Sequence, residues 1–100
     1  MPNPVIDFPW DKANVTGTGT VVGRPCVVHT ITLNGCTTLG SVDVYDALDA
    51  TVPATRIATY TLLGASASYQ GISFLYDCEM TTGIHMVFTA FVGDFTVTFK

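Results

Sequence analysis

With 100 residues, the chain is long enough for one folded domain with a modest core and too short for two. Only 12% of the residues are charged, about half the usual share, and only 4 are Lys or Arg in a chain of net charge −4. This composition excludes the basic patch that nucleic-acid binding needs, and no apolar run is long enough to cross a bilayer. The surface must therefore be covered by Thr, Ser, Asn and Gly or by a neighbouring chain, and we expect an obligate assembly.

Residues 1–17 are predicted to form an extended Pro-rich arm, because Pro2, Pro4 and Pro9 prevent a helix and lack the donor that a sheet ladder needs. The arm carries large apolar side chains, and aromatic residues of this kind dominate interfaces. It either tucks against its own domain or reaches onto a neighbouring subunit. The predicted subunit or capsid interface consists of Val5, Ile6, Phe8, Pro9 and Trp10.

Residues 18–100 are predicted to form a single β domain, because short segments of period-two alternation recur about every ten residues. The expected strands span residues 18–22, 26–33, 41–45, 55–63, 72–76, 84–92 and 95–99. In the second of these, Val27, His29, Ile31 and Leu33 are expected on one face, opposite Val28, Thr30 and Thr32.

Turns are expected at Asn34-Gly35 and Gly93-Asp94, with loops over residues 46–53 and 64–68. No helix longer than one turn is predicted. The pattern is typical of an antiparallel β-sandwich or barrel.

The two histidines are the first candidates for chemistry. His29 is expected in a core or rim position with one hydrogen bond, and His85 is expected to point outward, opposite Ile84 and Met86. Catalysis by either would need an orienting carboxylate and a nucleophile, and the sequence places neither beside it. We expect no enzymatic activity.

No metal or other cofactor is expected. Cys26 and His29 lie three residues apart on a strand and so point to opposite faces, and the chain contains no C-x-x-C pair. We interpret Cys26, Cys36 and Cys78 as buried thiols of a protein made in a reducing cytoplasm, since residues 1–4 lack the features of a secretion signal.

The acidic residues give no stronger candidate. Asp43, Asp46 and Asp49 match no calcium-loop spacing and are better explained as turn residues. Glu79 is the single glutamate, which disfavours a paired-carboxylate hydrolase.

The stretch from Arg24 to Lys100 resembles a family of short phage and prophage virion proteins. The blocks that carry the resemblance are Cys26-Val27-Val28-His29-Thr30-Ile31-Thr32-Leu33-Asn34-Gly35, Gly40-Ser41-Val42-Asp43-Val44-Tyr45-Asp46, Arg56-Ile57-Ala58-Thr59, Tyr76-Asp77 leading to Thr82-Gly83-Ile84, and Asp94-Phe95-Thr96-Val97-Thr98-Phe99. The resemblance covers about three-quarters of the chain and rests on the order of the blocks. It implies an all-β fold, an antiparallel β-sandwich (jelly-roll-like). The Pro-rich arm before Gly17 and the cysteines depart from the pattern of the family, so the extended N-terminal arm of the predicted fold rests on the prolines alone.

The resemblance also implies a function and partners. The expected protein is a non-enzymatic capsid cement or decoration protein of a bacteriophage virion, made in the host bacterial cytoplasm. Its expected partners are itself, with a homotrimer favoured, and the major capsid protein or another virion protein, with no nucleic acid and no membrane. The alternative is a carbohydrate- or host-surface-binding module, for which Tyr45, Tyr60, Tyr69 and Tyr76 with Asp43, Asp46 and Asp77 are the candidate residues.

Overall fold

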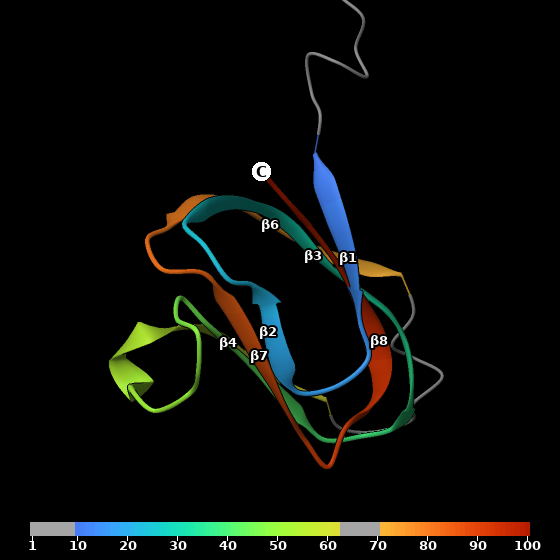
Figure 1. The fold of residues 1–100 in the computed structure, drawn as a ribbon. Coiled ribbons are helices and arrows are strands. Elements are labelled where there is room, and N and C mark those ends of the chain that lie inside the picture. The colour runs from blue at the N-terminus through green and yellow to red at the C-terminus, as the bar shows by residue number, and fades with distance from the viewer. Residues whose placement is uncertain (1–9, 63–70) are drawn as a thin grey trace, which may run out of the picture.

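The computed structural model describes residues 10–62 and 71–100, which form two antiparallel sheets of four strands packed face to face (Figure 1). The first sheet has the order β1-β8-β3-β6 and the second the order β2-β7-β4-β5. The strands of the first sheet are β1 (Asp11–Val15), β8 (Val92–Phe99), β3 (Cys26–Thr38) and β6 (Ile72–Met80). Those of the second are β2 (Gly19–Val22), β7 (Ile84–Thr89), β4 (Ser41–Tyr45) and β5 (Arg56–Thr61), which a 3₁₀ turn, η1 (Pro53–Thr55), precedes.

The pairing follows a simple rule, because the first half of the chain pairs with the second half as one long hairpin. Strand β1 pairs with β8, β2 with β7, β3 with β6 and β4 with β5. Folding this hairpin over adds the pairs β3–β8 and β4–β7. The result is the eight-stranded jelly roll, which confirms the predicted fold class.

The core lies between the sheets and is built by the alternation seen in the sequence. Phe95 and Val97 on β8 are fully buried, as are Ile84 and Met86 on β7, whereas the intervening residues face outward. Ile72 and Tyr76 on β6 pack against the same core. Among the described residues, the other apolar side chains with no exposed surface are Val28, Ile31, Val42, Val44 and Met80, and Leu33 completes the centre.

Two predicted turns are wrong, because both sequences lie inside strands. Strand β3 continues through Asn34 and Gly35 to Thr38, with register shifts on either side of Gly35. Gly93 lies in β8, where an added Cβ would approach the Gly35 carbonyl oxygen to 2.4 Å. These glycines therefore mark irregular pairing and close backbone approach between β3 and β8. The chain instead reverses near Ala90, which has a φ of 57°.

The predicted faces of β3 need a correction at His29. Val28 is buried together with Ile31 and Leu33, whereas Val27 is 38% exposed. His29 is an extra residue relative to β8, since Val28 pairs with Phe99 and Thr30 with Thr98. This β-bulge shifts the alternation by one residue. Val28 before the bulge and Ile31 after it therefore both point into the core, whereas a regular strand would place them on opposite faces.

The boundary of the predicted N-terminal arm also moves. Residues 11–15 were assigned to the arm but form β1, an edge strand paired with β8 from Asp11↔Phe99 to Val15↔Phe95. The strand that pairs with this segment, β8, lies at the other end of the sequence. The composition of residues 11–15 alone therefore does not indicate that they form a strand. The predicted interface residues Val5, Ile6, Phe8 and Pro9, the loop over residues 64–68 and Tyr69 lie outside the described residues.

Candidate functional site

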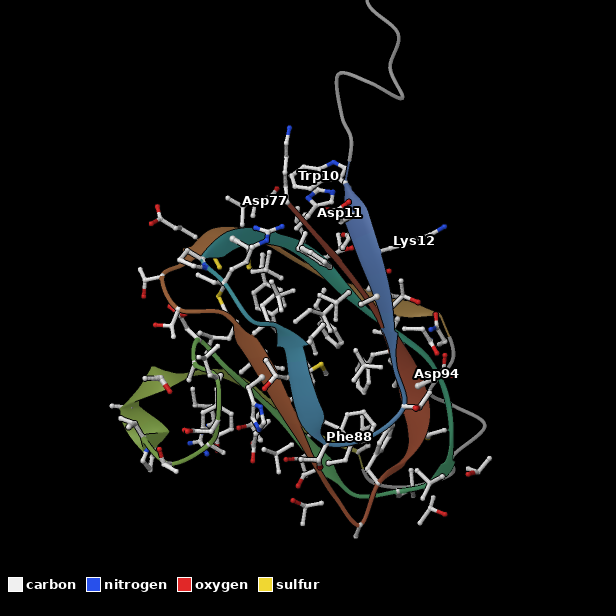
Figure 2. All side chains as sticks on the ribbon, viewed as in Figure 1. Trp10, Asp11, Lys12, Asp77, Phe88 and Asp94 are labelled. Carbon is white, nitrogen blue, oxygen red and sulfur yellow. The ribbon has the colours of Figure 1, made fainter. Side chains whose placement is uncertain are left out.

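The strongest candidate site is a cluster on the outer face of the first sheet, at the end where β1 begins. We call it the Trp10 patch, and it consists of Trp10, Val27, His29, Leu75 and Asp77. Figure 2 shows Trp10 and Asp77 together at this end of the molecule. Trp10 is the one predicted interface residue that the structure describes.

Two neighbouring bulges bring the polar residues of the patch together. On β6, Tyr76 and Asp77 together oppose His29, since Val28 pairs with Cys78 and Thr30 with Leu75. Asp77 takes the left-handed conformation, with a φ of 48°, which Asp tolerates better than most residues. Backbone irregularity of this kind is common where a side chain has to be aimed, and this is why we take the double bulge as a candidate site.

His29 links the other two polar or aromatic members. Its Nδ1–H donates a hydrogen bond to Oδ1 of Asp77. Its ring stacks on the indole of Trp10, with centroids 4.2 Å apart and planes 6° from parallel. Such stacking contributes about 0.5–1.5 kcal/mol beyond burial. Asp77 therefore orients His29, and His29 in turn holds Trp10 at a defined angle on the sheet.

Three side chains of the patch are apolar and exposed to solvent. Trp10 is 37% exposed, Val27 38% and Leu75 68%. Val27 lies two residues before His29 on β3 and Leu75 two residues before Asp77 on β6, so exposed apolar side chains flank the polar pair along both strands, with the exposed Glu79 opposite Val27. Large side chains held in place before binding lose little entropy on contact, which favours their use as anchors.

Hydrogen bonds between polar side chains, most of them uncharged, continue across this outer face. The hydroxyls of Thr30 and Thr98 bond across strands at 2.6 Å, and those of Thr32 and Ser73 at 2.9 Å. Asn34 donates to Oδ2 of Asp94 at 2.8 Å and to the hydroxyl of Thr96 at 2.9 Å. Cross-strand Thr and Asn pairs thus do what Lys and Glu do on most sheet surfaces, which accounts for part of the low charge.

His85 points outward from β7, as predicted, and lies 3.1 Å from the hydroxyl of Thr20. Within the described parts of the chain, no hydroxyl or thiol hydrogen-bonds to His29, whose bond goes to Asp77. The carboxylate that catalysis requires is therefore present beside His29, and no nucleophile of the described residues joins it.

The contacts of the cysteines and of several acidic residues indicate structural roles. Cys26 is buried as predicted, whereas Cys36 and Cys78 are only half-buried. Burial raises the pKa of the Cys26 thiol and also that of Cys78, which suppresses thiolate formation and reactivity. Asp43 accepts a hydrogen bond from Thr59, and Asp49 accepts two from Thr51. In the described ranges 10–62 and 71–100, no three His, Cys, Asp or Glu side chains gather as a metal site would require.

The carboxylate of Asp46 stabilises the turn between β6 and β7 by hydrogen bonds. It accepts backbone N–H groups from Thr81 and Thr82 at 2.9 Å each and from Gly83 at 3.3 Å. Burial raises the pKa of this carboxyl, but the hydrogen bonds outweigh that effect and leave the pKa below its usual value. Of the three aspartates predicted as turn residues, Asp49 bonds within its own turn, whereas Asp46 holds a distant turn and Asp43 lies inside strand β4, so the prediction is correct only for Asp49.

The tyrosines proposed for a carbohydrate site do not form a surface. Tyr45 is only 8% exposed, and Tyr60 and Tyr76 pack against the core. The phenol groups of Tyr60 and Tyr76 hydrogen-bond to each other. These residues serve the interior, so Trp10 is the exposed aromatic side chain of the described residues.

The partnership of His29 with Asp77 could not be found from the sequence. The two residues lie 48 positions apart and come into register only through the β3–β6 pairing. No local pattern marks the extra residue in either strand, because bulges leave the composition of a strand unchanged.

Comparisons with protein families, with curated proteins and with solved structures find no significant match to this chain. Among the residues that the structure describes, no helix is long and apolar enough to span a membrane.

Proposed function

We propose that this protein is a non-enzymatic structural protein that works by packing against other protein chains, as a capsid cement or decoration protein of a bacteriophage particle. The observation that carries the proposal is the Trp10 patch, where the exposed Trp10 stacks on a hydrogen-bonded His29–Asp77 pair that exposed Val27 and Leu75 flank along β3 and β6. The block resemblance from Arg24 to Lys100 supplies the phage context. Jelly rolls occur in viral capsid proteins but also in lectins and cupins, so the fold agrees with the proposal without deciding it.

The proposed mechanism rests on many moderate contacts. A capsid lattice offers identical sites in symmetric sets, and a closed oligomer that engages several at once gains avidity without any single strong contact. A trimer suits a three-fold position of such a lattice. The sparse charge of the surface reduces the desolvation of polar groups that each contact would otherwise require.

The first experiment locates the protein and its oligomer. Virions from the bacterium that carries the gene are purified, and the chain is sought on them by mass spectrometry and electron microscopy. The mass of the isolated protein is measured in solution by light scattering. A chain that is present in lysates but missing from purified particles would contradict the virion role.

The second experiment tests the Trp10 patch. A Trp10→Ala, Leu75→Ser double variant should bind particles at least tenfold more weakly, since central aromatic anchors carry most interface energy. Val92→Ser is the matched control, because Val92 is 56% exposed on the same sheet but lies outside the patch. Equal binding by both variants would remove the patch from the mechanism.

One observation keeps the carbohydrate-binding alternative, namely that the exposed Trp10 indole lies on the same His29 ring that the Asp77 carboxylate orients. A glycan array followed by titration of any hit tests it. Binding that is lost in Trp10→Ala would favour the alternative, whereas binding to particles without any glycan hit would favour the structural role.

A further inference from the structure

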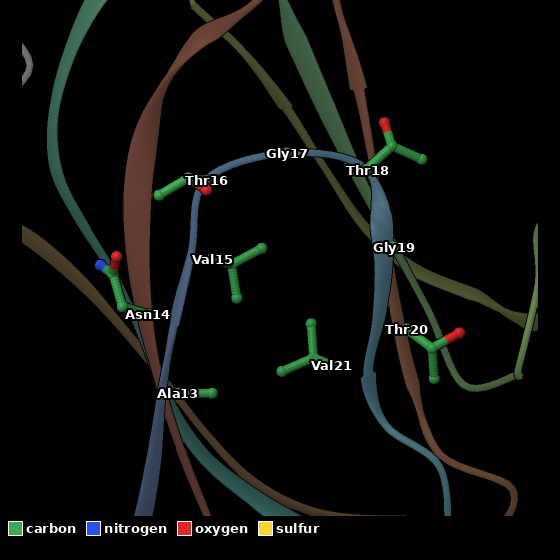
Figure 3. Close-up of a pocket in the computed structure, with 9 residues that line it drawn as sticks. All are labelled: Ala13, Asn14, Val15, Thr16, Gly17, Thr18, Gly19, Thr20 and Val21. Carbon is green, nitrogen blue, oxygen red and sulfur yellow. The ribbon is translucent and has the colours of Figure 1, made fainter.

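A slot opens between the edges of the two sheets, on the side where β1 and β2 lie (Figure 3). Its volume is about 380 Å³, and its walls are the two strands and the turn that joins them, residues 13–21. Val15 and Val21 point into it from opposite strands. The slot thus leads from solvent toward the hydrophobic core.

The side chains that face into the slot are small and apolar, whereas polar atoms contribute more than half of its total lining. Ala13 and Val15 face inward from β1, whereas Gly19 and Val21 face inward from β2. A Cβ added at Gly19 would find no atom within 4 Å, so the space in front of this residue is open. Room for additional apolar side chains is therefore present beside Gly19.

Residues at the rim of the slot hydrogen-bond to neighbouring segments, and these bonds fix its shape. Asn14 donates to Oδ2 of Asp94 at 2.8 Å, and the Thr20 hydroxyl donates to the Leu48 carbonyl at 2.8 Å. The Thr18 hydroxyl accepts the N–H of Phe88 at 2.9 Å. A preformed slot binds an extended segment without first paying for its own ordering.

Both walls also carry backbone groups suited to an added strand. Strand β1 pairs only with β8 and β2 only with β7, so in the described parts of the chain each presents one edge without a strand partner. Such edges accept an extended peptide, whose alternate side chains then enter the neighbouring pockets.

One segment of this chain has the matching pattern. Residues 4–9 read Pro-Val-Ile-Asp-Phe-Pro, and if this sequence bound as an added strand, Ile6 and Phe8 would fall on one face and Asp7 on the other. The prolines at both ends limit backbone pairing to the residues between them, which prevents open-ended growth of a sheet.

The position of Trp10 favours a second copy as the source of this segment. The chain enters β1 at Trp10, whose ring is stacked on His29 on the outer face of the first sheet. To reach its own slot, the chain would have to fold back on itself directly before Trp10, whose indole is already held against His29. A neighbouring copy needs no such reversal.

We propose that the slot between β1 and β2 receives residues 5–8 of a second copy of this chain, with Ile6 and Phe8 beside Gly19 and Val21. The proposal rests on the self-association in the proposed function and names the surface that performs it. Each chain then contributes one segment and one slot.

Filling the slot tests the receptor half of the proposal in the full-length protein. Gly19→Leu should place a side chain in the open space and weaken self-association at least tenfold, measured by analytical ultracentrifugation. Gly35→Leu is the matched control, because a Cβ at Gly35 also meets nothing within 4 Å but lies outside the slot. Circular dichroism checks that both variants fold. Unchanged association of folded Gly19→Leu would overturn the proposal.

Crosslinking tests the occupant. Phe8 is replaced by the photoreactive benzoylphenylalanine, and ¹⁵N-labelled chains are mixed with unlabelled ones before irradiation. Crosslinks from position 8 to residues 13–21 that join labelled to unlabelled chains are expected. Crosslinks within one chain only, or to residues outside 13–21, would overturn the proposal.

The two proposals fail in different ways. If Gly19→Leu associates normally while the Trp10→Ala, Leu75→Ser variant loses particle binding, the slot proposal is wrong and the structural function stands. If the unaltered protein is monomeric at all concentrations and is missing from particles, both are wrong.

Discussion

The two open sides of the sandwich are closed in different ways. On the side of β5 and β6, Tyr60 stacks on Phe74 with ring centroids 4.6 Å apart and on Phe95 at 5.9 Å, and its phenol bonds to Tyr76. On the side of β1 and β2, the inward residues are only Ala, Val and Gly, and a slot of about 380 Å³ remains. Among the described residues, the first side is closed by aromatic rings that pack on one another, whereas the second is lined by small residues and leaves space that a partner can fill.

The largest expected effect comes from opening the sealed side. Tyr60→Ala should lower the free energy of unfolding by about 3–4 kcal/mol, because it removes a packed ring and leaves a cavity next to Phe95. Urea denaturation followed by tryptophan fluorescence measures the change. A loss below about 1 kcal/mol would mean that the aromatic seal contributes little.

The control variant for Tyr60→Ala is Tyr60→Phe, which retains the aromatic ring. Burial, together with the Tyr76 hydrogen bond, raises the pKa of Tyr60 far above its usual value, so the phenol stays protonated as a donor or acceptor to Tyr76. Tyr60→Phe should therefore lose only about 1 kcal/mol, the net worth of one hydrogen bond.

The second prediction compares one truncation in the centre of the core with the same truncation at the slot. Val44→Ala should cost about 2–3 kcal/mol, because Val44 has no exposed surface and the two lost methyl groups leave a closed cavity. Val21→Ala should cost about 1 kcal/mol, because Val21 is half-buried and lines a slot that is already open. Equal losses in thermal or urea unfolding would show that the slot is as tightly packed as the centre.

The third prediction concerns the turn that joins β6 of the sealed side to β7. The pKa of Asp46 is lower in the folded protein than in the unfolded chain, so its stabilisation is present above the unfolded pKa of about 4 and is lost as the pH falls through the folded value. Asp46→Asn should cost about 1–2 kcal/mol at pH 7 and should flatten the loss of stability below about pH 4. Urea unfolding at pH 7 and at pH 3 measures both effects. An unchanged acid dependence in the variant would assign the acid sensitivity to other groups.

The smallest expected effect is at the slot itself and has the opposite sign. Gly19→Ala should raise the free energy of unfolding by about 0.5 kcal/mol, because the added Cβ meets nothing and the unfolded chain loses freedom. Gly35→Ala, whose Cβ also meets nothing, should behave alike in thermal unfolding. Destabilisation at Gly19 alone would mean that the slot is narrower than its volume indicates.

The alternation of the sequence predicted much of the fold, and the exceptions have a common cause. The inward row Phe95, Val97 and Phe99 and the row Ile72, Phe74 and Tyr76 follow from the pleat of one strand, which is a local property. The turns expected at Asn34-Gly35 and Gly93-Asp94 failed because the two segments pair with each other, Gly35 opposite Asp94. A glycine that permits a turn and a glycine that permits close strand approach look alike in a sequence.

The sequence by itself determined an all-β chain of low charge, with its inward rows and its Pro-rich N-terminus, because composition and period-two patterning depend only on near neighbours. The tertiary structure alone decided the jelly-roll strand order, the bulges that place His29 beside Asp77, and the contrast between the sealed and the open side. Each of these depends on which distant strands pair and in what register, and that choice is made by the packing of the whole core.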